Sequence, residues 1–136
     1  NTIAAGGIWR KPLFLECTLD ETTGESLTAL AHRGARRVFS AQTARALREL
    51  LASVVTEGTG HEAAPTEGTA AGKTGTAQTG QFAAGKELKN YWFAGFYPAR
   101  NPRYTIVVLQ DGQTGPSRTS AAIFAQVCDA LDAAGE

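Results

Sequence analysis

The sequence predicts an α+β fold in which packed helices cover an antiparallel sheet of three main strands, with a small additional hairpin near the N-terminus. Apolar residues recur at helical spacing in residues 41–56 and again in residues 118–133, which predicts two amphipathic helices. Between them, three segments rich in threonine, aromatic or β-branched residues are separated by turn-forming residues, which predicts strands. The 136 residues would form one domain-sized unit.

The N-terminal segment predicts the small hairpin. Residues Ile8–Leu19 read as extended chain, and the following Asp20–Glu25 has the composition of a turn. A return limb near Ser26–Leu30 completes the hairpin. Residues His32–Arg37 contain three arginines, and we interpret this segment as a solvated basic loop.

The first helix is predicted over Ala41–Thr56. Ser40 is a suitable N-cap because its hydroxyl can accept a hydrogen bond from a first-turn amide. Gly58 and Gly60 end the helix. The polar face carries Arg45, Arg48 and Glu49, and the apolar positions are Ala44, Leu47, Leu50, Leu51, Val54 and Val55.

Three strands are predicted next. Residues Thr69–Gln78 offer little bulk to pack on either face, and glycine weakens a strand, so this segment suits a place where a ligand or another backbone approaches closely. A loop is expected near Gly80–Lys89. Residues Tyr91–Tyr97 and Tyr104–Leu109 then carry strong strand signals, and the second is apolar on both faces, as in a central strand.

A turn-rich loop, Asp111–Ser117, precedes the last helix, which is predicted over Arg118–Ala133. Its expected apolar stripe is Ile123, Phe124, Val127, Cys128 and Leu131. Cys128 would be a buried free thiol, and the two cysteines of the chain do not form the dense framework of a disulfide-stabilised scaffold.

Composition excludes some classes of function. Thirteen Lys and Arg balance thirteen Asp and Glu, so the chain lacks the basic footprint of a nucleic-acid binder. No apolar run approaches the ~20 residues of a membrane helix, so we expect no membrane segment in this chain. We expect no metal and no cofactor. The chain has no methionine and begins at Asn1, which suggests that it was processed or is a piece of a longer protein.

The segment Gly72–Thr76, with the sequence Gly-Lys-Thr-Gly-Thr, carries the chemistry. A phosphate-binding P-loop requires glycine five residues before its Gly-Lys pair, where this chain has Glu67, and it requires a buried strand before it. A Lys-Thr-Gly strand that lines an acyl-transfer site fits better. The lysine ammonium and threonine hydroxyls can hold a substrate carboxylate, and the glycine lets a substrate lie along the strand. The alternative interpretation is that Lys73 is a solvated lysine on an edge strand, without a role in a site.

The context of this tripeptide resembles the C-terminal part of the transpeptidase domain of class B penicillin-binding proteins. Ile3–Ile8 with Lys11-Pro12 is similar to the family's Gly-Gly…Lys-Pro segment, and Val54–Gly60 is similar to its Glu-Gly-Thr-Gly helix exit. Ala71–Gln78 resembles the active-site strand, and Trp92–Tyr104 resembles the next strand with its turn. The resemblance covers nearly the whole chain, in the family's order.

This resemblance implies a partial β-lactamase/transpeptidase-like fold and a serine D,D-transpeptidase that cross-links peptidoglycan stem peptides and is acylated by β-lactams. Lys73 and Thr74 would contact the substrate carboxylate, with help from Thr76. Gly75 would give clearance, and the Thr76 N–H would contribute to the oxyanion hole. Residues 1–136 would be a C-terminal fragment of that domain. The family places the parent protein on the extracytoplasmic face of the membrane, held by an anchor outside this chain.

The sequence departs from the family in one respect. None of its serines has a lysine three residues later, and no Ser-x-Asn motif occurs, so the fragment alone is expected to be inactive. The strand Tyr104–Leu109 would be left as an exposed sheet edge, which suggests self-association. Two other functions stay open: a non-catalytic module that binds peptidoglycan or a protein partner, and a β-lactamase or D,D-carboxypeptidase.

Overall fold

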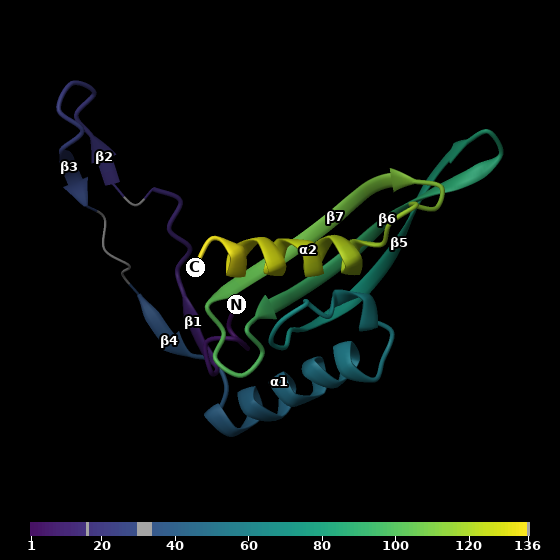
Figure 1. Ribbon diagram of the computed structural model, residues 1–136, viewed down its shortest axis with the longest axis horizontal. Coiled ribbons are helices and arrows are strands. Elements are labelled where there is room, and N and C mark those ends of the chain that lie inside the picture. The colour runs from purple at the N-terminus through teal and green to yellow at the C-terminus, as the bar shows by residue number, and fades with distance from the viewer. Residues whose placement is uncertain (16, 30–33, 136) are drawn as a thin grey trace.

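The structure, a computed structural model, describes residues 1–15, 17–29 and 34–135 (Figure 1). Its elements in chain order are β1 (Ile8–Arg10), β2 (Cys17–Leu19), β3 (Ser26–Ala29), β4 (Ala35–Arg37), α1 (Ala41–Thr56), the 3-10 turn η1 (His61–Ala63), β5 (Ala71–Ala83), β6 (Lys86–Tyr97), β7 (Tyr104–Gln113) and α2 (Ser120–Ala133). No helix within these residues has both the length and the apolar character needed to cross a membrane.

A three-stranded antiparallel sheet with the order β5–β6–β7 forms the centre of the molecule. Helix α2 lies across one face of this sheet, and α1 lies beside β5 (Figure 1). The predicted α+β fold with three main strands and packed helices is therefore confirmed. Among the described strands, β7 has no partner beyond β6 and forms an edge of the sheet.

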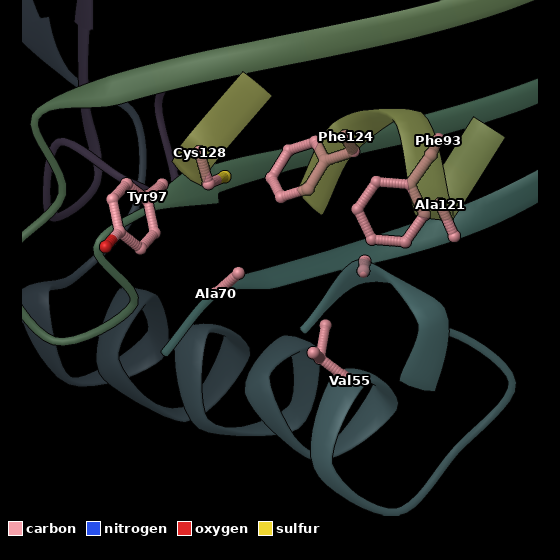
Figure 2. Packing of buried hydrophobic residues seen from close by; sticks show 8 residues of the cluster. Val55, Ala70, Phe93, Tyr97, Ala121, Phe124 and Cys128 are labelled. Atoms are coloured by element: carbon pink, nitrogen blue, oxygen red, sulfur yellow. The ribbon is translucent and has the colours of Figure 1, made fainter. Parts of the chain in front are cut away.

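The hydrophobic core lies between α2 and the sheet and extends to α1. Phe93 of β6 and Phe124 of α2 are fully buried, with ring centroids 4.7 Å apart and ring planes tilted by 56°. Figure 2 shows Cys128 and Tyr97 on one side of this pair and Val55 of α1 below it. Because each buried aromatic ring contributes roughly 2–3 kcal/mol, this pair anchors α2 to the sheet.

Two paired glycines bring β5 and β6 close to the core. Gly72 lies opposite Gly95 in the sheet. A Cβ on Gly72 would lie 2.5 Å from the Phe93 ring, and a Cβ on Gly95 would lie 2.6 Å from the Ala71 carbonyl oxygen and 2.9 Å from the Phe124 ring. The lack of bulk in this part of β5 therefore makes room for core aromatic rings as well as for a ligand.

The N-terminal segment differs from its prediction in part. The predicted hairpin is present as β2 and β3, with Leu30 outside the described residues.

The expected basic loop is wrong for Arg36 and Arg37, because both lie in β4, which pairs with β1. Arg36 stacks over Trp9 at 5.7 Å from the ring centroid, and the Arg37 guanidinium donates to the Gly6 carbonyl at 3.0 Å. These contacts give the two arginines a structural use that charge patterning does not indicate. His32 and Arg33 lie outside the described residues.

The expected loop near Gly80–Lys89 is also wrong. Strands β5 and β6 continue through most of it and meet at the two-residue turn Ala84-Gly85. Both residues have positive φ, 48° and 76°, which suits the right-handed twist of a tight hairpin. Similarly, β7 continues to Gln113 into the segment predicted as a loop. These strand ends were not predicted because they project from the core and bury little, so their residues are mostly polar and lack the apolar pattern of a strand.

The helices agree with the sequence more closely. Helix α1 has the predicted bounds, and the Ser40 hydroxyl accepts from the Thr43 N–H at 2.9 Å. Helix α2 begins at Ser120 rather than Arg118, because Thr119 caps it. Its buried face is also rotated from the predicted stripe. Phe124 and Cys128 are buried as expected and Cys128 is a free thiol, but Val127 is 37% exposed. The other buried positions are small residues: Ser120, Ala121 and Ala125.

Candidate active site

The four predicted site residues, Lys73 to Thr76, lie in the first half of β5. Successive side chains of a strand point to opposite faces, so Thr74 and Thr76 share one face of the sheet. Together with Gly75 they line an open groove of about 330 Å³. The structure thus brings both predicted threonines and the glycine to one concave surface.

Lys73 is exposed and does not itself line this groove, but its side chain extends along β5 to Thr74, which does. Its ammonium donates to the Thr74 hydroxyl oxygen at 2.9 Å and to the Thr74 carbonyl oxygen at 3.2 Å. The Thr74 hydroxyl oxygen also lies 3.4 Å from the hydroxyl oxygen of Thr59. Because Thr74 accepts from a cation, its own proton remains available to an acceptor such as a carboxylate oxygen.

Gly75 provides open space beside this polar cluster. A Cβ placed on it would contact only the Cβ of Trp92, at an ordinary 3.5 Å. The Thr76 hydroxyl has no hydrogen-bond partner among the described residues. After the Lys73–Thr74 pair, the strand therefore continues with Gly75, which has no side chain, and with the free hydroxyl of Thr76.

Sequence reasoning missed the other walls of the groove. They come from the loop after α1, from β6 and from the segment that leads into α2, and they are Thr59, Glu62, Tyr91, Trp92, Gly115, Pro116, Thr119, Ser120 and Ala121. The Thr119 hydroxyl donates to the Glu62 carboxylate, which ties η1 to the start of α2. The sequence signal for Thr59 was its place in the Glu-Gly-Thr-Gly helix exit, whereas Glu62 and Thr119 lie 57 residues apart and share no motif.

The described groove contains no serine or cysteine placed as a nucleophile. Ser120 is 3% exposed and donates to the Tyr91 carbonyl at 2.9 Å, which is a packing role. Cys128 lies in the core, where burial raises the pKa of its thiol to about 12 and keeps it neutral. The groove as described can bind and orient an anionic ligand through Lys73 and the threonines.

Comparison with known proteins matches residues 1–129 to the family described as the penicillin binding protein transpeptidase domain. Among curated proteins, the chain is 33% identical over 146 residues to penicillin-binding protein PbpB of Mycolicibacterium smegmatis, covering 96% of this chain and 22% of that protein. It is 31% identical over 125 residues to stage V sporulation protein D of Bacillus subtilis, covering 90% of this chain and 19% of that protein. The chain thus spans about a fifth of these relatives.

Solved structures agree with this match. The D,D-transpeptidase domain of a peptidoglycan glycosyltransferase from Eggerthella lenta aligns over 98% of this chain and 30% of its own, with a TM-score of 0.74 and 29% identity. Penicillin-binding protein A from M. tuberculosis, solved as an imipenem acyl-enzyme, aligns over 99% of this chain and 28% of its own, with a TM-score of 0.72 and 27% identity. The predicted resemblance is confirmed: this chain belongs to the penicillin-binding protein transpeptidase domain family.

Proposed function

We propose that residues 1–136 are the C-terminal part of the transpeptidase domain of a serine D,D-transpeptidase, which cross-links peptidoglycan stem peptides and is acylated by β-lactams. The observation that carries this proposal is the Lys73–Thr74 cluster at the rim of the groove beside Gly75. It supplies a cation, hydroxyl donors and clearance on one strand edge. Membership of the family supports the same reaction class.

In this proposal the substrate peptide lies along the edge of β5. Lys73 and Thr74 hold its terminal carboxylate, and the free hydroxyl of Thr76 adds a further hydrogen bond. The Thr76 N–H stabilises the oxyanion that develops on the scissile carbonyl. Gly75 keeps the strand surface clear so that the substrate can pair with the backbone as an added strand.

The nucleophile belongs to another part of the proposed protein. No serine of this chain stands three residues before a lysine, so we expect the 136 residues alone to be inactive. A serine in a Ser-x-x-Lys motif upstream would attack the carbonyl, with a Ser-x-Asn motif completing the site. The whole protein would work on the extracytoplasmic face of the bacterial membrane, held by an anchor outside this chain.

Mass spectrometry after incubation with penicillin tests this proposal. The full-length protein should gain one covalent equivalent, and the 136-residue chain should gain none. Acylation of the chain alone would contradict its expected inactivity. A full-length protein that takes up no penicillin would contradict the enzymatic function.

Lys73 provides the sharper test within the full-length protein. Lys73→Met should slow acylation by ~100-fold, since removal of a single preorganised donor costs about that much. Lys86→Met is the matched control, because Lys86 is an exposed lysine at the far end of the β5–β6 hairpin and should leave the acylation rate unchanged. Equal rates for wild type and Lys73→Met would remove Lys73 from the site.

A further inference from the structure

A second hollow that the structure describes is separate from the candidate active site. It is a cleft of about 490 Å³ between α1 and the turn that joins β6 to β7. It shares no lining residue with the groove beside Gly75. Its volume lies within the range of small-molecule sites.

Three arginines line this cleft, in a chain whose net charge is zero, and we call it the arginine cleft. Arg45 and Arg48 are one helical turn apart on α1, and Arg100 comes from the β6–β7 turn. The cleft contains one acidic residue, Glu49. The lining side chains therefore carry a net charge of +2, three arginines less one glutamate.

The side chains of these arginines have no partner among the described residues. Within residues 1–15, 17–29 and 34–135, the guanidinium groups of Arg45, Arg48 and Arg100 make no hydrogen bond or ion pair. By contrast, Arg37 and Arg118 each bind an oxygen of the protein, and Arg36 stacks on a ring. Arg48 is also half-buried, so its charge is partly withdrawn from water without an anionic partner. A bound anion would offset that cost.

The walls that present these arginines are held by backbone hydrogen bonds. The Ala99 N–H donates to the Thr69 carbonyl at 2.7 Å, which fastens the β6–β7 turn to the segment that leads into β5. The Arg103 N–H donates to the Tyr97 carbonyl at 3.0 Å within the same turn. Arg100 is therefore presented by an anchored turn, opposite two arginines on a regular helix.

We propose that the arginine cleft is a binding site for a small polyanion, a ligand with two or more phosphate or carboxylate groups. Guanidinium groups bind both kinds of oxyanion through paired N–H donors, and three of them can engage separate anionic groups of one ligand. The proposal is independent of acyl transfer, because it uses none of the residues placed in the groove.

Calorimetric titration of the full-length protein at low ionic strength tests the site, with inorganic pyrophosphate in one arm and citrate in the other. We expect 1:1 binding of at least one probe, and the stronger probe identifies the anionic group preferred. Affinity should fall with added salt. Arg48→Gln should weaken binding by about tenfold, which is the loss of one charge-assisted interaction. The triple variant Arg45→Gln, Arg48→Gln, Arg100→Gln should abolish it.

Two controls isolate the cleft. Arg10→Gln removes an exposed arginine of β1, outside the cleft, and should change the affinity by less than about twofold. Lys73→Gln should leave the stoichiometry at one, since the active-site cation is not used. Circular dichroism should show the triple variant to be folded. No binding of either probe to the folded protein, or an equal loss with Arg10→Gln, overturns the proposal, as does binding that the folded triple variant retains.

Discussion

At the scale of single residues, two glycines of β5 have different uses that their sequence spacing does not distinguish. Gly72 and Gly75 are three residues apart in one strand, yet a Cβ on Gly72 meets the Phe93 ring at 2.5 Å and a Cβ on Gly75 meets nothing closer than 3.5 Å. Gly72 is therefore a packing residue, whereas Gly75 borders open space at the groove. Only the packing of Phe93 against β5 reveals this difference.

A pair of alanine substitutions tests that distinction. Gly72→Ala should lower the free energy of unfolding by ~2–3 kcal/mol, because overpacking a filled core forces ring and backbone shifts. Gly75→Ala should change it by less than ~0.5 kcal/mol, as for a surface substitution. Urea denaturation measures both. In the full-length protein, Gly75→Ala should still slow acylation by penicillin, since the added methyl group occupies the proposed clearance. Equal destabilisation by both substitutions would contradict these roles.

Tyr97 illustrates a second residue-scale effect, a buried phenol held by a carboxylate. Its hydroxyl donates to Asp132 at 2.5 Å, and this hydrogen bond, with burial, raises the pKa of Tyr97 from its ordinary 10 to about 12. Because the folded-state pKa lies above the unfolded value, the stabilisation is complete below pH 10 and is lost as the pH rises from 10 to 12. Tyr97 thereby links β6 to the end of α2.

Chemical denaturation from pH 8 to 12 checks this linkage. The wild type should lose stability between pH 10 and 12 more steeply than Tyr97→Phe, which has no phenol to ionise at this position. Tyr91→Phe, a substitution of the tyrosine that lines the groove, should keep the wild-type slope. If Tyr97→Phe and the wild type had the same slope, the raised pKa would be wrong.

At the scale of elements, prediction succeeded where a segment carried its own signal. Helix α1 was predicted with its bounds because the apolar spacing lies within it and the Ser40 cap and glycine exit flank it directly. The far half of the β5–β6 hairpin was missed because its side chains are mostly polar or small and project beyond the core. Its strand character comes from pairing with the neighbouring strand, which composition does not report. The buried face of α2 differs from the predicted apolar stripe because small residues of α2 approach the sheet more closely than Val127 could.

The tip of this hairpin offers an element-scale prediction. Ala84 has a φ of 48°, a left-handed conformation that costs a non-glycine residue roughly 1–2 kcal/mol. Asparagine tolerates this conformation, and Asn-Gly is a favoured two-residue hairpin turn. Ala84→Asn should therefore raise the free energy of unfolding by ~0.5–1 kcal/mol. Ala83→Asn, one residue earlier and still in β5, should bring no gain, and a similar gain from both would contradict the explanation.

At the scale of the whole molecule, the candidate site combines one contiguous motif with residues from distant segments. Lys73 to Thr76 could be predicted because they are consecutive and carry a recognisable chemistry. Glu62 and Thr119 could not be, because only the packing of η1 and α2 brings them to β5, and Thr59 had no signal beyond its place in the helix exit. The sequence predicts that Lys73 and Thr74 both contact a substrate carboxylate, but it does not predict their direct hydrogen bond. The closeness of the Thr59 hydroxyl depends on how the loop after α1 returns to the sheet.

In the described sheet, the edge strand β7 also carries solvent-exposed apolar side chains. Val107 is 58% exposed and Leu109 is 44% exposed, on a strand that pairs only with β6. Unpaired edge strands of this kind add a further strand when one is offered. We therefore propose that the 136-residue chain self-associates through β7. The family resemblance implies that a strand from outside these 136 residues pairs with β7 in the proposed full-length protein.

Sedimentation equilibrium distinguishes these states. The 136-residue chain should form a concentration-dependent dimer, and the double variant Val107→Lys, Leu109→Lys should be monomeric, because lysine on an edge strand opposes pairing. Leu50→Lys is the control: Leu50 is a 64% exposed leucine of α1, and its replacement should leave the dimer intact. The full-length protein should not dimerise through β7, so the double variant should leave its mass unchanged. A monomeric 136-residue chain at high concentration, or a dimer lost equally in Leu50→Lys, would contradict pairing at β7.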